Sequence, residues 1–321
     1  MAKKIKHPKK RIKYQKKTRH PQAYFWLDGK FVKESDANVP ILTHSMQYGS
    51  GIFEGIRAYK TQSGTAIFRL DDHVKRFFRS ARIYSMNLFY EEEDIRDAII
   101  KTIRQNSLDS CYIRPFAFYN DSNIGVSTKG KKTSVFIAAM PFGAYFGKGK
   151  ENGIKCKISS WHRINSLILP PEAKASGNYI NSIIANLEAV STGADEAILT
   201  SLDGYVAEGP GENIFVVEDG KLITPSREAD ILLGITRDTV IRLADKIGLE
   251  VVERNIHKEE LYVCDEAFFA GTAAEITPIT MIDSKKVGTG RPGSITNRIA
   301  DEYISTVNGK KKEFENWLTY V

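Results

Sequence analysis

One isolated lysine has the surroundings needed for covalent chemistry. Lys174 lies in the segment EAKASGNY, and no other charged residue stands between Glu172 and Glu188. A lysine held near apolar surface can lose its proton at modest pH and attack a carbonyl carbon, which is the requirement for a Schiff base. Most lysines have an ordinary surface role, so Lys174 alone does not establish such chemistry.

A carboxylate follows this lysine after one predicted helix and one predicted strand. Apolar residues recur at helical spacing from 179 to 190, and residues 195–199 have the pattern of a short strand. Glu208 ends a further short strand, against a turn built from the sequence GPG. We therefore treat Lys174 and Glu208 as a candidate reactive pair, which the neighbouring elements must position.

Two later segments have the form of anion-binding sites. In LLGITRD, residues 232–238, a helix opens after a glycine, so the free amides and the threonine hydroxyl at its start could hold a phosphate. An ordinary N-cap threonine is the alternative interpretation. In AGTAA, residues 270–274, a predicted strand runs into small residues whose amides could lie beside a phosphate or a carboxylate.

The first half of the chain supplies aromatic and cationic candidates for a pocket wall. The segment HSMQYGSGIFEGIRAYK, residues 44–60, contains glycines that would let the backbone approach a ligand closely. A plain loop leading to a strand is an equal interpretation. Within this segment Tyr48, Phe53 and Arg57 could line a largely apolar pocket that contains one cation.

Two further arginines have a context that admits an anion. Arg69 precedes an amphipathic helix over 70–86 with two aspartates in its first turn, and it is either a surface residue or an anion ligand. The predicted strand 111–121 places Tyr112 and Arg114 on one face by alternation. An arginine inside an apolar strand is costly unless it meets an anion or a carboxylate.

Length and composition indicate a globular α/β protein of roughly two domains. The chain has 321 residues, of which 42% are hydrophobic. Asp28-Gly29 predicts a hairpin turn near its start, and a second helix is expected over 92–106. The Gly/Pro/Lys-rich segment 141–150 predicts a linker between a smaller domain, 22–140, and a larger one, 151–321. From the residues alone, the fold class is mixed α/β.

The basic charge of the chain belongs to its first residues. The net charge is +7, and the first 20 residues carry ten Lys or Arg and no acid, so the remainder carries 7 − 10 = −3. The segment 1–21 is predicted to be a disordered basic tail; a weak nucleic-acid or anionic-surface contact and a targeting peptide are the alternatives. Nucleic acid is therefore not the expected partner of the folded part.

Three cysteines, Cys111, Cys156 and Cys264, are scattered without a CxxC pair. Their odd number and spacing argue against a disulfide framework and a zinc site, and we expect no metal. No apolar run approaches the length of a membrane span. A cytoplasmic location is the expectation.

Taken in order, several motifs resemble those of the class IV aminotransferases, which depend on pyridoxal 5'-phosphate (PLP). These motifs are HSMQYGSGIFEGIRAY, FRLDDH, YIRP, KASGNY, AEGPGENIF, GITRD and GTAAEITP. The resemblance begins near Tyr24, and FEGIRAY followed by YIRP is similar to the branched-chain amino acid aminotransferase subgroup. It implies fold type IV, as in D-amino acid aminotransferase: a smaller α/β N-terminal domain and a larger α/β C-terminal domain with the cofactor between them.

The resemblance also implies roles for the cofactor-side residues. Lys174 would form the Schiff base with PLP and shuttle the proton, Glu208 would face the pyridine nitrogen, and Tyr179 would hydrogen-bond the phenolic oxygen. The phosphate would be held by Arg69, Ile235, Thr236 and Thr272.

On the substrate side, the resemblance implies a pocket for leucine, isoleucine or valine that also accepts glutamate and 2-oxoglutarate. The α-carboxylate would be bound by Tyr112 and by the amides of Thr272 and Ala273. Arg114, helped by Arg57, would take the second carboxylate of glutamate. The side-chain pocket would be shaped by Tyr48, Phe53 and Tyr145. Residues like Tyr145 come from the partner subunit in the family, so a homodimer or a higher homo-oligomer is expected.

Two other functions stay open from the sequence. A different class IV enzyme, acting on D-amino acids or amines or as an aminodeoxychorismate lyase, shares most of these motifs. A nucleic-acid-binding protein that acts through its basic tail is the more distant alternative.

Overall fold

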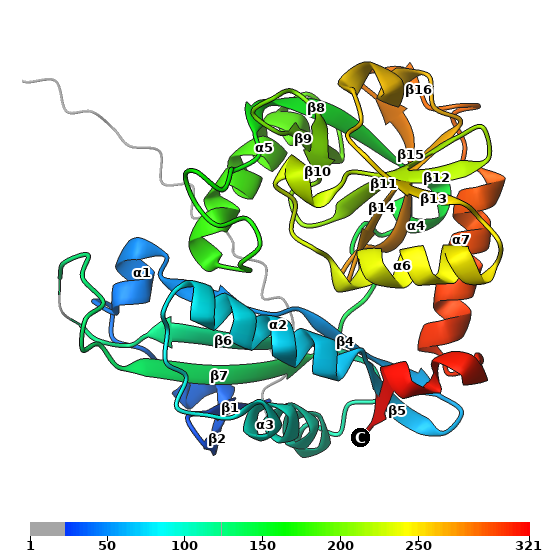
Figure 1. Cartoon of the computed structure of the whole chain (residues 1–321). Coiled ribbons are helices and arrows are strands. Elements are labelled where there is room, and N and C mark those ends of the chain that lie inside the picture. Colours follow the sequence, from blue (N-terminus) through cyan, green and yellow to red (C-terminus); the bar gives the residue numbers. More distant parts are fainter. Residues whose placement is uncertain (1–22, 123) are drawn as a thin grey trace, which may run out of the picture.

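We describe a computed structural model of the chain, which covers residues 23–122 and 124–321. Figure 1 shows two sheet-containing domains joined by a short connection. The basic segment 1–21, for which we predict a disordered tail, lies outside the described residues.

The first domain is built on an eight-stranded sheet with the order β17-β5-β4-β6-β7-β1-β2, and β3 pairs with β6. Its strands are β1 (Tyr24–Leu27), β2 (Lys30–Lys33), β3 (Gly51–Phe53), β4 (Ile56–Thr61), β5 (Gly64–Phe68), β6 (Cys111–Tyr119), β7 (Thr133–Met140) and β17 (Leu318–Tyr320). The helices that go with it are α1 (His44–Tyr48), α2 (Leu70–Ile83) and α3 (Glu92–Gln105).

Helix α2 carries two different faces. Its apolar residues pack into the core of the first domain, together with α3 and the sheet. Its polar residues face the second domain: Arg76 donates to the Leu233 carbonyl (3.1 Å), and the Ser80 hydroxyl accepts from the Lys174 amide (3.0 Å). The helix therefore supports the wall of the second domain that contains the candidate lysine (Figure 1).

The second domain is built on a nine-stranded sheet with the order β10-β9-β8-β15-β14-β11-β12-β13, and β16 pairs with β15. Its strands are β8 (Ile154–His162), β9 (Glu196–Thr200), β10 (Val206–Glu208), β11 (Asn213–Glu218), β12 (Lys221–Thr224), β13 (Val251–Glu253), β14 (Glu266–Gly271), β15 (Glu275–Ile282) and β16 (Lys285–Lys286). Its helices are α4 (Gly149–Asn152), α5 (Tyr179–Ser191), α6 (Ile235–Lys246) and α7 (Ser294–Val307).

Local sequence signals explain several of these elements. The predicted helices at 70–86, 92–106 and after Lys174 are confirmed as α2, α3 and α5. In the β1–β2 hairpin, Leu27 pairs with Lys30, and Asp28 and Gly29 between them both have positive φ, as a tight two-residue turn requires.

Two segments differ from the prediction. Residues 44–48 form the short helix α1, although the glycines that follow suggest a loop. The strand β17 pairs with β5 of the first sheet, with Leu318 opposite Phe68. Sequence reasoning assigns this C-terminal segment to the larger domain, because its partner strand is far away in sequence and no local pattern identifies it.

Candidate active site

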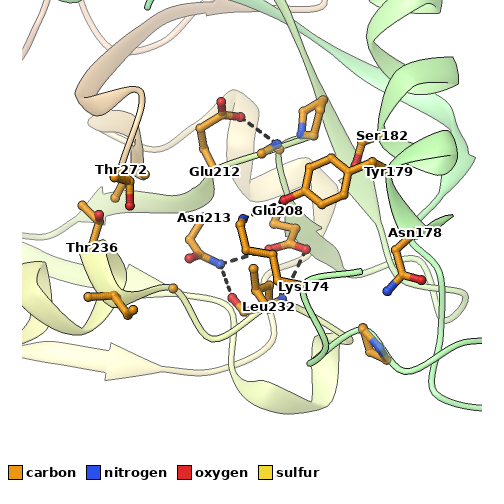
Figure 2. Close-up of a pocket in the computed structure, with 18 of the residues that line it drawn as sticks. Lys174, Asn178, Tyr179, Ser182, Glu208, Glu212, Asn213, Leu232, Thr236 and Thr272 are labelled. Carbon is orange, nitrogen blue, oxygen red and sulfur yellow. Dashed lines mark hydrogen bonds between the residues drawn. The ribbon is translucent and has the colours of Figure 1, made fainter. Parts of the chain in front are cut away.

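A pocket lies where the two domains meet, and its empty volume is about 550 Å³. That volume is within the usual range for small-molecule sites. Six of the predicted site residues line it: Lys174, Tyr179, Glu208, Ile235, Thr236 and Thr272. Figure 2 shows Thr236 and Thr272 at one end of this pocket, with Lys174 and Glu208 near its middle.

Lys174 is held by both domains. Its backbone amide donates to Ser80 of α2, and its carbonyl accepts from the Phe53 amide at 3.0 Å. Its Nζ donates to the Tyr179 hydroxyl at 2.7 Å, and lies 5.1 Å from the centre of the Phe53 ring. The amine therefore has a fixed position in a half-buried, partly aromatic setting, and no carboxylate forms an ion pair with it within the described chain.

Glu208 is buried, and its carboxylate has three donors. Arg163 Nε lies 2.6 Å from Oε1, Asn213 Nδ2 donates to Oε2 at 3.1 Å, and the Leu232 amide also points at the group. Burial raises the pKa of Glu208, and the charge of Arg163 opposes that rise. We assign the ionised form because a guanidinium and two further donors converge on it.

The start of α6 forms an anion cradle. Gly234 is the N-cap and supplies no capping side chain, so the amides of the first turn have no side-chain acceptor at this cap. A Cβ at Gly234 would lie 2.0 Å from Asn213 Oδ1, so a larger residue would collide with the Glu208 network. Thr236 is buried in this turn, and Thr272 lines the same pocket. A phosphate fits this set of donors.

Arg69 does not line the pocket, but it lies beside α6. Its Nη2 is 2.8 Å from Asp238, and its Nη1 donates to Thr239 at 3.2 Å. Its backbone is left-handed, with φ of 53°, and its side chain is buried. The structure thus places the charge of Arg69 against the first two turns of the helix that would hold a phosphate.

Aromatic residues and a cation of the first domain lie next to Lys174. The Phe53 and Tyr179 rings have centroids 4.9 Å apart, and the Arg114 guanidinium stacks 4.5 Å from the Phe53 ring. Arg114 Nη2 donates to the Tyr112 hydroxyl at 2.8 Å. The Arg114 Nε atom is buried and has no hydrogen-bond partner among the described residues. Arg114 therefore keeps donor capacity for an anion.

The other predicted substrate residues are arranged differently. Arg57 lies 3.1 Å from Glu275, so its charge is balanced within the protein. Ala273 is in the same loop as Thr272. The Tyr48 hydroxyl accepts from the Gly125 amide at 3.1 Å, and Tyr48 is 42% exposed. Tyr145 is 53% exposed, and neither tyrosine lines the pocket of its own chain.

Sequence reasoning missed several pocket residues. Arg163 and Asn213 contact Glu208, and Leu232 presents its amide to it. Asn213 stands in the motif AEGPGENIF, so its position beside a turn was a usable signal. Arg163 gave no signal, because it follows β8 and meets Glu208 only through the pairing of β8, β9 and β10.

Two buried acids near the pocket also went unnoticed. Glu54 accepts from both His73 and Arg76 at 2.7–2.9 Å, and these groups lower its pKa despite burial. Glu212 lines the pocket, and its carboxylate accepts from the Gly211 amide at 3.1 Å. Burial and the nearby Glu196 raise the pKa of Glu212 to about 8. The carboxyl of Glu212 is therefore mostly neutral at pH 7.

Other ligand classes have little support in the structure. In the part of the chain that the structure describes, no group of three or more His, Cys, Asp or Glu could hold a metal ion. None of the helices formed by these residues has the length and apolar character needed to cross a bilayer. The three cysteines are buried and unpaired.

Comparisons with known proteins agree with this geometry. Residues 51–282 match the family model described as amino-transferase class IV. A branched-chain-amino-acid aminotransferase of Pseudomonas aeruginosa is 46% identical over 92% of this chain and 96% of its own length, and that of Escherichia coli K12 is 41% identical over 93% and 97%.

Solved structures give the same result. A branched-chain aminotransferase from Thermoproteus uzoniensis, crystallised with norvaline, is 45% identical and superposes with a TM-score of 0.89 over 92% of this chain and 98% of its own. The Escherichia coli enzyme is 40% identical, with a TM-score of 0.89 over 92% and 98%. The fold is thus the two-domain α/β fold of type IV expected from the sequence, and the chain belongs to the class IV aminotransferase family.

Proposed function

We propose that this chain is a PLP-dependent branched-chain L-amino acid aminotransferase that uses 2-oxoglutarate as acceptor. The observation that carries the proposal is one pocket in which a positioned lysine, a buried and ion-paired glutamate and an uncapped helix start converge. The names of the relatives support the substrate class. Two further solved branched-chain aminotransferases are described with pyridoxamine 5'-phosphate and with N-(5'-phosphopyridoxyl)-L-glutamate, which supports the cofactor and the acceptor.

The residues present fit PLP. The α6 amides, Thr236 and Thr272 would hold its phosphate, with Arg69 adding positive charge behind the helix. Tyr179 would donate to its phenolic oxygen, and Glu208 would keep a proton on its ring nitrogen. When bound, PLP supplies a ring that accepts the electrons left after the substrate loses its Cα proton.

The protein's own groups would then move the proton and orient the substrate. Lys174 Nζ, after its release by an incoming amine, would take the Cα proton and return it one atom away. Tyr112 and the amides at Thr272 and Ala273 would hold the α-carboxylate. Phe53 would contact the apolar side chain, and Arg114 would pair with the second carboxylate of glutamate. One pocket would thus serve both half-reactions.

Homodimer formation is part of the proposal. One face of α5 leaves large apolar side chains exposed beside the pocket region: Ile180, Ile183, Leu187 and Val190. Exposed apolar groups of this extent favour burial against another subunit, and Tyr48 and Tyr145 do not line the pocket of their own chain. Sedimentation velocity should give a mass of at least two chains. We also propose a cytoplasmic location, which the three unpaired cysteines support.

The visible absorption spectrum of the purified protein with PLP tests the reaction. We expect a band above about 400 nm, as for other lysine Schiff bases of this kind, that is bleached by L-leucine and not by D-alanine. Bleaching by D-alanine alone would point to another class IV activity. Lys174→Ala should bind PLP without the band and lose turnover, and turnover retained by this variant would refute the assignment.

A further inference from the structure

A strained residue ends the loop that lies between β14 and β15. Gly271 pairs with Glu275, so residues 272–274 form a three-residue hairpin loop. In such loops the residue after the turn adopts the left-handed conformation, where glycine is usual. Here that residue is Glu275, with φ of +55°. A buried, non-glycine residue in this region persists only where its surroundings hold it there.

The side chain of Glu275 has partners on two other segments. The Tyr59 hydroxyl donates to its Oε1 at 2.9 Å, and Arg57 Nη1 lies 3.1 Å from the same oxygen. Lys150, at the end of the predicted linker, forms an ion pair with its Oε2. Glu275 is only 3% exposed, so these contacts replace water around the charge.

These contacts leave the loop with one arrangement. Arg57 and Tyr59 lie on β4, in the rigid sheet of the first domain. The carboxylate is anchored to that sheet, and the backbone of the same residue ends the loop. A glycine would satisfy the backbone but could not make the anchor. The choice of glutamate at a glycine position therefore indicates that the side chain is needed.

We propose that Glu275 is a positioning residue, which fixes the amides of Thr272 and Ala273 for the α-carboxylate of the substrate. The inference rests on the proposed function, which places that carboxylate at this loop. It also gives Arg57 a role different from that of Arg114, because the charge of Arg57 is balanced by Glu275. The donor amino acid and the acceptor oxo acid share an α-carboxylate, so a displaced loop should weaken both.

The test uses 4-methylvaleric acid, a carboxylate with the carbon skeleton of leucine and no amino group. Calorimetry of the PLP-loaded protein should show its Kd raised at least about tenfold in Glu275→Gly, since misplaced groups of about 1 Å have large effects. Glu275→Gln, which keeps an oxygen acceptor for Tyr59, should show about a threefold rise. The matched control is Asp219→Gly at an exposed turn with φ of 49°, which should not change the Kd.

Steady-state kinetics separate positioning from a purely structural role. The KM values for L-leucine and for 2-oxoglutarate should rise by the same factor in Glu275→Gly. A variant that had only lost folded protein would lower kcat and leave both KM values and the Kd unchanged, which would overturn the inference.

The remaining outcomes are distinguishable. If the unmodified protein is bleached by leucine and binds the probe, and Glu275→Gly binds it within about twofold, the inference fails and the proposed function stands. If the unmodified protein neither reacts with leucine nor binds the probe, both fail. Where Glu275→Gly does not fold, Glu275→Gln decides, and a Kd equal to that of the unmodified protein overturns the inference.

Discussion

The two walls of the pocket differ in how far their charges are balanced within the protein. On the wall of the second domain, Glu208 has a guanidinium and two further donors. On the wall of the first domain, Arg114 has a tyrosine hydroxyl and aromatic rings, and its Nε has no partner among the described residues. The Glu208 wall is therefore balanced without a ligand, whereas the Arg114 wall is open and has a donor left for one.

This difference fits the two kinds of ligand that we propose. A cofactor stays bound through both half-reactions, so its wall gains from a preorganised carboxylate that needs no rearrangement. The acceptor carries a second carboxylate that branched-chain amino acids lack. A cation that an internal acid already balances would bind that carboxylate less strongly than a cation that is free to pair.

Removing the cation from the balanced wall should have the largest effect. Arg163→Met leaves Glu208 buried without its ion pair, so the free energy of unfolding of the cofactor-free protein should fall by about 3–5 kcal/mol at pH 7. Urea denaturation measures this loss. Arg242→Met, which removes an exposed pair with Asp238, is the control and should cost about 0–1 kcal/mol. Equal losses in the two variants would show that the wall is not charge-balanced as described.

The pH dependence sharpens the same prediction. Glu208 already has a raised pKa in the folded protein, and losing Arg163 should raise it further. A protonated Glu208 needs no cation, so the loss caused by Arg163→Met should shrink as the pH falls towards the ordinary range of a glutamate.

Removing the cation from the open wall should change specificity more than stability. Arg114→Met should raise the KM for 2-oxoglutarate by about 10–100-fold, the value of a charged hydrogen-bonded contact, and change the KM for L-leucine by less than about threefold. Steady-state kinetics with each substrate varied in turn measure both. Arg104→Met, at an exposed position of α3, is the control. Equal changes for the two substrates would remove Arg114 from acceptor recognition.

The smallest effect concerns Glu212, which lies on the balanced wall and forms no ion pair within the described chain. Its folded pKa of about 8 exceeds the ordinary value of 4.5, so the folded state binds the extra proton and stability falls as the pH rises from 4.5 to 8. Glu212→Gln should remove this slope and stabilise the protein at about pH 8 on the order of 1 kcal/mol. Urea denaturation at about pH 5 and pH 8 measures it.

The control for Glu212→Gln is Glu250→Gln, at an exposed site paired with Lys221. It should shift stability by only about 0–1 kcal/mol and leave the slope between about pH 5 and pH 8 in place. A slope that survives in Glu212→Gln would mean that another buried acid, such as Glu196, holds the proton.

Local patterns in the sequence predicted much of this architecture. Helical spacing identified α2, α3 and α5, and the Asp-Gly pair at 28–29 identified the first hairpin. The order of the motifs brought Lys174, Glu208, Thr236 and Thr272 together as candidates, and all four line one pocket. These residues stand at the ends of elements or in turns, where the sequence constrains the backbone strongly.

Contacts between distant strands could not be predicted in this way. Arg163 reaches Glu208 because β8 and β10 both flank β9. The anchoring of Glu275 depends on β4 of the other domain, although its position after GTAA, where glycine would be expected, was a usable signal. Such residues carry no pattern of their own, because their partners are set by sheet order.

The pairing of β17 with β5 has a consequence for the order of folding during synthesis. Leu318 pairs with Phe68, 318 − 68 = 250 positions earlier, so the first sheet waits at that edge until the whole second domain has been made. An unpaired edge strand is a site for wrong pairing with other chains. A nascent chain of this protein therefore carries an open β5 edge through most of its translation, and the final strand closes it.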